Sequence, residues 1–224
     1  LLIEALIGRG AYGAVYRARD SQLDRSVALK VLGNPTLSRA ELLREGQLMA
    51  RIDHPHVLKV YGAFEHDGQI GFAMELMQGQ TLEQWMQRQG RLGASELIAI
   101  AHELCAALCA LHRGEVLHGD LKPGNVLRHP DGRWVVADFG SSQFAHDAYG
   151  SSGTPLYMAP EQFRQESAST LSDQYSLGVL LFRLATHRYP FEAETTAELE
   201  AKHAADTRLR LLDLRPDLPR PLVQ

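Results

Sequence analysis

One short run of the sequence, His118-Gly119-Asp120-Leu121-Lys122-Pro123-Gly124-Asn125, holds three side chains that could act together on a phosphate group. Asp120, Lys122 and Asn125 stand at positions i, i+2 and i+5, and the Pro and Gly between them predict a tight loop. A carboxylate can accept a hydroxyl proton, and an ammonium group can neutralise a transferring phosphate. The amide oxygen of Asn125 can ligate Mg²⁺, a hard cation that prefers oxygen. The spacing therefore favours metal-assisted chemistry on a phosphate.

A second acidic residue follows the β-like run Val135-Val136-Ala137. Asp138 stands at the end of this run, directly before Phe139-Gly140, where the glycine predicts a turn. Its carboxylate can be the second protein ligand of the metal. Two unrelated loops with solvated acids would explain neither the spacing in the first run nor its occurrence together with the second.

Near the N-terminus three glycines recur in Gly8-Arg9-Gly10-Ala11-Tyr12-Gly13. In dinucleotide-binding folds such glycines open a helix, and an acidic residue follows about 20 positions later. Here Val15-Tyr16-Arg17-Ala18 predicts a continuing strand and Gly33 stands at that offset, which excludes the dinucleotide fold. The pattern instead predicts a hairpin whose backbone N–H groups can approach phosphate oxygens, with an ordinary glycine-rich hairpin as the alternative.

The strand-like run Val27-Ala28-Leu29-Lys30 holds a lysine on the face opposite Leu29. Such a lysine is most often an exposed residue of an edge strand. A functional role requires an acidic partner, and Glu45 in the following helical segment is the candidate.

The elements that must position these residues change in character near residue 75. Strands are predicted at 1–7, 14–18, 26–32, 57–64 and 69–76, with a helix at 38–52. Helices then predominate, at 81–89 (capped by Thr81), 95–112 (capped by Ser95) and 173–186. The sequence thus predicts an α+β fold with a small β-rich lobe and a larger helical lobe. The lobes meet near Glu75–Gly79, and ligand sites favour such junctions.

Composition narrows the class of protein further. The chain has 224 residues, of which 45% are hydrophobic and 22% charged, so it is neither disordered nor fibrous. Its net charge of -4 gives no electrostatic reason to expect nucleic acid. The apolar stretch Leu97 to Leu111 is interrupted by His102 and Glu103 and is too short to span a bilayer, which predicts a soluble chain with no membrane contact from this segment. A membrane anchor elsewhere in a longer gene product stays open as an alternative. Cys105 and Cys109 are expected to lie together on a buried helix face.

Taken in order, these motifs resemble eukaryotic-like (Hanks-type) Ser/Thr protein kinases, of the sort common in bacteria. The resemblance rests on the glycine loop, Val27-Ala28-Leu29-Lys30, the HxDLKPxN pattern of 118–125, Asp138-Phe139-Gly140, Ala159-Pro160-Glu161 and Ser172-Asp173-Gln174-Tyr175-Ser176-Leu177-Gly178. It implies one kinase domain over 1–224, with an N-lobe at 1–76 and a C-lobe at 77–224.

The resemblance also implies roles for single residues. Asp120 would be the catalytic base and Lys122 would contact the γ-phosphate, while Asn125 and Asp138 would bind Mg²⁺ or Mn²⁺. The ATP-binding residues would be Gly8, Gly10, Gly13, Val15, Ala28, Lys30, Glu45, Met74, Glu75, Met77 and Leu127. Thr154 would lie beside the acceptor hydroxyl of a protein substrate. Met49, Val60, His118 and Phe139 would stack into a hydrophobic spine between the lobes. The expected location is the cytoplasm.

Two departures from the family pattern carry expectations of their own. Gly119 stands where the family usually has an arginine that meets a phosphorylated activation-loop residue, so activity is expected not to require that phosphorylation. Ser141, Ser142, Ser151 and Ser152 could still be autophosphorylated. The chain also ends soon after 215–219, which implies that the family's last helices and their partner for Glu161 are missing, leaving exposed apolar surface.

Two alternatives remain at this stage. The sequence His118-Gly119-Asp120 with Asn125 also occurs in kinases of aminoglycosides and choline, which phosphorylate small molecules. Those families lack the peptide-binding segment that Gly153-Thr154-Pro155 and Ala159-Pro160-Glu161 resemble. A pseudokinase that binds nucleotide as a scaffold is the other alternative, and its usual mark, loss of a catalytic side chain, is not seen here.

Overall fold

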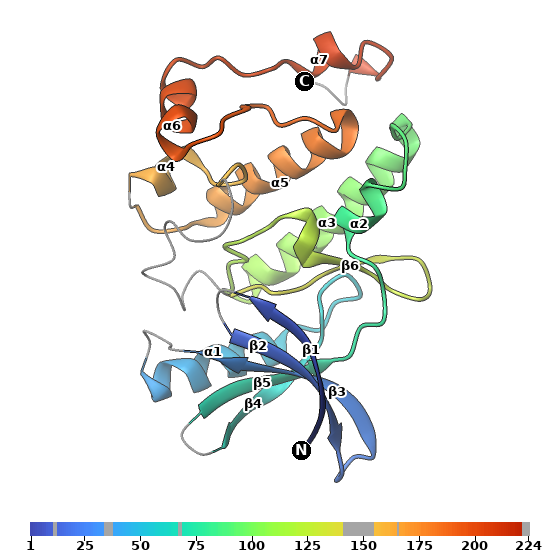
Figure 1. The fold of residues 1–224 in the computed structure, drawn as a ribbon, viewed down its shortest axis with the longest axis vertical. Helices are drawn as coiled ribbons and strands as arrows, with labels where there is room; N and C mark the ends of the chain where they lie inside the picture. The colour runs from blue at the N-terminus through green and yellow to red at the C-terminus, as the bar shows by residue number, and fades with distance from the viewer. Residues whose placement is uncertain (11–12, 34–37, 67–68, 141–154, 165, 221–224) are drawn as a thin grey trace.

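A five-stranded antiparallel sheet forms the N-terminal part of the chain, with the strand order β1-β2-β3-β5-β4 (Figure 1). The computed structural model describes residues 1–10, 13–33, 38–66, 69–140, 155–164 and 166–220. The strands are β1 (Leu2–Gly10), β2 (Gly13–Asp20), β3 (Arg25–Leu32), β4 (Val60–His66) and β5 (Gln69–Glu75). The five predicted strands are therefore present, and the glycine-rich segment joins β1 to β2.

Helix α1 (Arg39–Arg51) covers one face of this sheet by packing on β4 and β5. Ser38 begins the helix, because its hydroxyl accepts the backbone N–H of Glu41 while the Glu41 carboxylate accepts that of Ser38. Leu42 and Met49 are buried against the sheet. Each such side chain contributes about 1.5–3 kcal/mol through burial.

The C-terminal part is mainly helical. Its elements are α2 (Leu82–Met86), α3 (Ala94–Arg113), η1 (Pro123–Asn125), β6 (Val126–Arg128), β7 (Trp134–Val136), α4 (Pro160–Phe163), α5 (Thr170–Thr186), α6 (Thr196–Ala204) and α7 (Leu211–Leu214). Helices α3 and α5 pack together and lie above the sheet in Figure 1. One hydrophobic core, from Phe72 in β5 to Leu184 in α5, continues through both lobes.

Helix α3 differs in two respects from its prediction. Its N-cap is Gly93 and not Ser95, because the Glu96 carboxylate accepts the backbone N–H of Gly93 at 3.1 Å. Cys105 and Cys109 lie on one face of the helix as predicted, but both are exposed, so their predicted burial is wrong. The buried face is formed instead by larger side chains such as Leu104 and Leu108.

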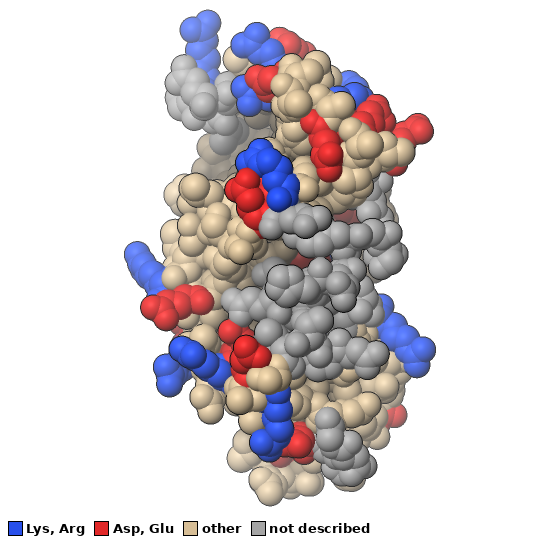
Figure 2. Space-filling model, turned by 90° about the vertical axis from the view of Figure 1, so that its left-hand side faces the viewer, with Lys and Arg blue, Asp and Glu red and all other residues tan. Residues whose placement is uncertain are grey.

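By length and composition alone, α3 is also the one helix in the described part of the chain that could cross a membrane. It packs against α5 and β7, as the central helix of a folded domain does. Lys and Arg side chains alternate with Asp and Glu over the described part of the face in Figure 2. No extended patch of one sign is seen there.

The segment between α1 and β4 lies against the C-terminal lobe. Strand β4 begins at Val60 and not at Val57, because Val57 forms a parallel bridge with Val136 of β7. Leu58 donates its N–H to the carbonyl of Val136, and Val136 donates to the carbonyl of His56, both at 2.9 Å. The His56 imidazole also donates from Nδ1 to the carbonyl of Trp134 at 2.9 Å.

The main connection between the lobes runs from β5 to α2 and passes close to β6. The backbone N–H of Arg128 donates to the carbonyl of Gln80 at 2.9 Å. A methyl group on Gly79 would lie 1.8 Å from the carbonyl oxygen of Arg128, so only glycine allows this approach.

We therefore expect Gly79→Ala to lower the free energy of unfolding by about 1–3 kcal/mol, because the two backbones must separate. Gly90→Ala is the matched control, since no atom lies within 4 Å of the added methyl group at that position. The melting temperatures of the two variants test this. Equal melting temperatures would contradict the expectation.

Candidate active site

The loop before β6 brings three polar side chains together. Lys122 Nζ donates to Asp120 Oδ2 at 2.7 Å, and Asn125 Nδ2 donates to the same oxygen at 3.1 Å. Asn125 Nδ2 also donates to the backbone carbonyl of Asp120 at 2.8 Å. Helix η1 creates this arrangement, because its tight turn returns Asn125 to the start of the loop. Within the described part of the chain, no hydrogen bond reaches Asp120 Oδ1, so this oxygen can accept a proton.

Asp173 of α5 anchors the backbone of this loop. The residue is 2% exposed, and its two carboxylate oxygens accept the N–H groups of His118 and Gly119, each at 2.9 Å. His112 of α3 donates from Nε2 to the same carboxylate at 2.8 Å. Gly119 has a φ of 77°, a left-handed conformation that glycine adopts readily. The sequence placed Asp173 in a family motif at the start of an apolar helix but did not predict this role.

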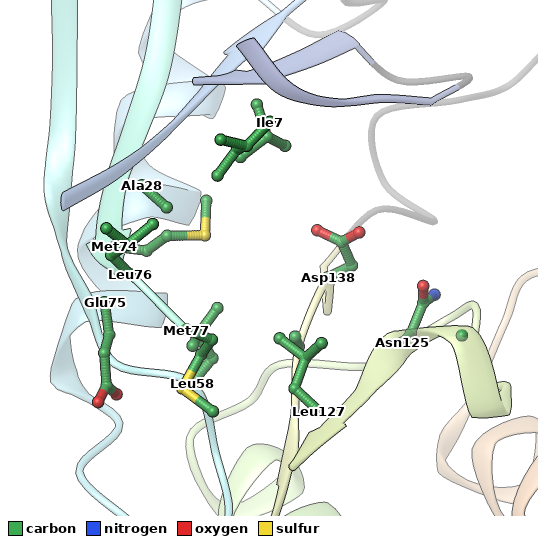
Figure 3. Close-up of a pocket in the computed structure, with 13 residues that line it drawn as sticks. Ile7, Ala28, Leu58, Met74, Glu75, Leu76, Met77, Asn125, Leu127 and Asp138 are labelled. Carbon is green, nitrogen blue, oxygen red and sulfur yellow. The ribbon is translucent and has the colours of Figure 1, made fainter. Parts of the chain in front are cut away.

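Asp138 lies two residues after the end of β7, with a φ of 57°. Hydrogen bonds on either side hold it there: Ala137 donates its N–H to the carbonyl of Asn125 at 2.8 Å, and Gly140 donates to that of Leu117 at 3.0 Å. A left-handed conformation at a residue other than glycine is costly and is common at functional sites. It directs the carboxylate of Asp138 toward the junction of the lobes (Figure 3).

Lys30 of β3 connects the two lobes. Its Nζ lies 3.1 Å from Asp138 Oδ1, and the residue is only 8% exposed. The expected ion pair between Lys30 and Glu45 is not formed. Among the described residues, the acid within 4 Å of the Lys30 ammonium group is Asp138. Glu45 makes another interaction, and partial burial raises the pKa of its carboxyl group, opposed by Arg44.

An apolar pocket opens next to these polar groups (Figure 3). Its described lining residues are Ile7, Val15, Ala28, Leu58, Met74, Glu75, Leu76, Met77, Gly124, Asn125, Leu127, Ala137 and Asp138. The predicted residues Val15, Ala28, Met74, Glu75, Met77 and Leu127 are among them. The sequence did not single out Ile7, Leu58 and Ala137, which look like ordinary core residues. The Glu75 carboxylate points away from the pocket, so its backbone is the part that can face a ligand.

The remaining predicted residues lie elsewhere. Gly8 pairs with Val15, and Gly10 pairs with Gly13, at the closed end of the β1–β2 hairpin. The three glycines lie outside the described lining of the pocket. Thr154 and the four serines of 141–152 lie outside the described residues, as do Ala11 and Tyr12.

His118 is completely buried, and Met49, Val60 and Phe139 are at most 5% exposed and belong to one hydrophobic core. Its Nδ1 accepts the backbone N–H of Asp120 at 3.2 Å, while Nε2 has no hydrogen-bond partner in the described part of the chain. Burial lowers the pKa of this imidazole, and the nearby Asp173, Asp120 and Asp138 oppose the shift. The ring therefore stays neutral at physiological pH.

This predicts a pH dependence of stability. Because the folded-state pKa lies below the ordinary 6.5, the unfolded chain binds a proton first on acidification. His54 and His203 shift in the same direction. The melting temperature should thus fall as the pH decreases from 7.5 to 5.5, and less steeply in a His118→Asn variant. A melting temperature that rises over this range would refute it.

Residues 2–221 match the family described as protein kinase domain. Similar relatives include the probable serine/threonine-protein kinase PknB of Lactococcus lactis, 33% identical over 96% of this chain and 36% of the relative. Others are the serine/threonine-protein kinase pkn3 of Myxococcus xanthus (35% identity, 96% and 43%) and the serine/threonine-protein kinase PrkC of Bacillus subtilis (34%, 88% and 32%). The chain spans about a third to two fifths of the length of these relatives.

Proposed function

Because the chain belongs to the protein kinase domain family, we propose that it transfers the γ-phosphate of ATP to serine and threonine hydroxyls of proteins. The observation that carries the proposal is the pairing of Asp120 with Lys122 and Asn125 beside an apolar pocket between the lobes. The relatives that match most of the chain are named serine/threonine-protein kinases, which supports this choice of acceptor.

The pocket fits a nucleotide base. Ile7 and Ala28 lie on one side of the pocket and Leu127 on the opposite side (Figure 3). Val15 also lines it, so a flat ring would lie between apolar surfaces. The backbone between Met74 and Met77 would supply hydrogen bonds to the ring edge. Lys30, at the polar side of the pocket, would bind the phosphates.

A divalent metal also fits the residues present. Asn125 and Asp138 offer an amide oxygen and a carboxylate, a hard donor pair that suits Mg²⁺. Two protein ligands are sufficient, because Mg²⁺ commonly takes its other ligands from phosphates and water. When bound, the metal would neutralise charge on the phosphates. We propose Mg²⁺, with Mn²⁺ as a substitute.

The protein's own part in the reaction follows from the loop geometry. Asp120 Oδ1 accepts the proton of the attacking hydroxyl, since Oδ2 is already held by Lys122 and Asn125. Lys122 pairs with the Asp120 carboxylate and offsets negative charge on the phosphate that is transferred. Asp173 keeps the loop backbone fixed, so these groups need little reorganisation. Thr154 is proposed to lie beside the acceptor hydroxyl.

The activity is proposed not to depend on activation-loop phosphorylation, because residue 119 is glycine and offers no side chain to bind a phosphate. Phosphatase treatment followed by a kinase assay tests this. Loss of activity after treatment would contradict it. The proposed location is the cytoplasm, where ATP is available.

The test of function is incubation of the 224-residue chain with labelled Mg-ATP and a generic basic protein, followed by phosphoamino-acid analysis. Phosphoserine or phosphothreonine that disappears on chelation of the metal is the expected result. ATP binding without transfer would indicate a nucleotide-binding scaffold. Transfer only to choline or an aminoglycoside would indicate a small-molecule kinase.

A further inference from the structure

Arg183 of α5 is the centre of a cluster that joins three separate parts of the C-terminal lobe. Its two terminal nitrogens donate to the two carboxylate oxygens of Glu83, each at 2.8 Å. The nitrogen Nη1 also donates to the Tyr157 hydroxyl at 2.6 Å. The guanidinium group lies over the ring of Tyr189, 4.7 Å from its centre. We call Glu83, Tyr157, Arg183 and Tyr189 the Arg183 cluster.

The cluster is well satisfied and largely shielded from water. The side chains of Arg183 and Glu83 are 21% and 29% exposed, and their paired geometry is the strongest that an arginine and a carboxylate adopt. The rings of Tyr157 and Tyr189 meet edge to face with centres 5.5 Å apart. Burial raises the pKa of Tyr157, so its hydroxyl stays neutral and accepts the bond from Arg183.

Two members, Glu83 and Tyr157, come from parts of the chain next to the proposed phosphate-transfer and acceptor sites. Glu83 is on α2, which packs against η1, the turn that carries Asn125. Tyr157 follows Thr154 by three residues, in the segment proposed to bind the protein acceptor. The carbonyl of Tyr157 accepts a hydrogen bond from Ser176 of α5 at 2.7 Å. Helix α5 therefore holds Tyr157 twice: Arg183 binds its side chain, and Ser176 binds its backbone.

The cluster is separate from the nucleotide pocket. None of its four members is among the described residues that line that pocket. A change in the cluster should therefore affect the protein acceptor and leave ATP binding in place.

We infer that Glu83 and Arg183 are positioning residues for the protein acceptor, acting through Tyr157. Glu83 neutralises and orients the Arg183 guanidinium, and Arg183 holds Tyr157, so that the segment 155–159 presents a fixed surface to an acceptor peptide. The inference rests on the proposed kinase function.

Steady-state kinetics of Glu83→Gln test the inference. The amide of glutamine carries no charge and offers Arg183 one acceptor in place of two, so Tyr157 loses its fixed partner. We expect KM for the protein acceptor to rise about tenfold. KM for ATP and ATP hydrolysis without acceptor should stay within about twofold of the unaltered chain. Glu192→Gln is the matched control, since it breaks the exposed paired contact between Arg188 and Glu192.

Two further variants separate positioning from a general loss of stability. Tyr157→Phe removes only the hydroxyl, and its effect on acceptor KM should not add to that of Glu83→Gln, because both break one chain of contacts. The double exchange Glu83→Arg/Arg183→Glu reverses the ion pair. Its carboxylate on α5 can accept a hydrogen bond from the Tyr157 hydroxyl, so acceptor KM should return toward that of the unaltered chain.

An unchanged acceptor KM in Glu83→Gln would overturn the inference. Equal losses in acceptor phosphorylation and ATP hydrolysis, with a lower melting temperature and no rescue by the exchange, would also overturn it and leave a purely structural ion pair. If the unaltered chain transfers no phosphate, the proposed function itself fails, and the inference fails with it.

Discussion

An Asp120→Asn variant is expected to lose about 10²–10⁴-fold in kcat for protein phosphorylation, the range for removal of a general base. Asparagine keeps the size of the side chain but accepts a proton far less readily. It also removes the charge that pairs with Lys122 at 2.7 Å. Because Asp120 is not among the described residues that line the pocket, ATP binding should persist. Rapid-mixing kinetics measure the rate, and the ATP-induced shift in melting temperature measures binding.

The control for this variant is Asp206→Asn, an exposed acid in the loop after α6 whose φ of 48° suits asparagine well. The control should retain full activity. If Asp120→Asn kept more than about a tenth of the kcat, Asp120 would not be the base, since a general base contributes at least about a hundredfold.

Asp173→Ala should destabilise the fold by about 3–5 kcal/mol, the effect of breaking a buried, charged hydrogen-bond network. The change leaves two backbone N–H groups and the His112 imidazole without their acceptor. It should also lower kcat, because the backbone that carries Asp120 loses its anchor on α5. Urea unfolding at neutral pH measures the change in the free energy of unfolding.

The comparison for Asp173→Ala is Asp53→Ala. Asp53 pairs with Lys59 at 2.8 Å, but its side chain is 85% exposed, and surface pairs contribute little to stability because water screens them. A similar loss in both variants would mean that the buried network at Asp173 does not hold the loop.

The strands and the catalytic loop could be predicted because their signals are local. Alternating apolar residues mark a strand within one segment, and Asp120, Lys122 and Asn125 lie within six positions of one another. The same holds for Thr81, which caps α2 as predicted by accepting the N–H of Gln84 at 3.1 Å. Each of these features depends on neighbours in sequence and needs no knowledge of the tertiary fold.

Features that depend on long-range contacts were predicted less well. The partner of Lys30 is 108 positions away, and sequence alone favoured the nearer Glu45. The burial of Cys105 and Cys109 was wrong because helical spacing fixes which residues share a face but not which face meets α5 and β7. Arg183 had no signal, since its partner Glu83 is 100 positions away in another helix.

The segment from His56 to Leu58 belongs to the N-terminal lobe by its place in the sequence but to the C-terminal lobe by its hydrogen bonds. These residues precede β4 in the chain, yet their hydrogen bonds run to Trp134 and Val136 of β7. If the cleft opens as a rigid-body rotation, this segment stays with the C-terminal lobe, and the rotation axis passes near Ile52 and near the end of β5. Amide hydrogen exchange at Leu58 and Val136 would then remain slow while the cleft between the lobes opens and closes.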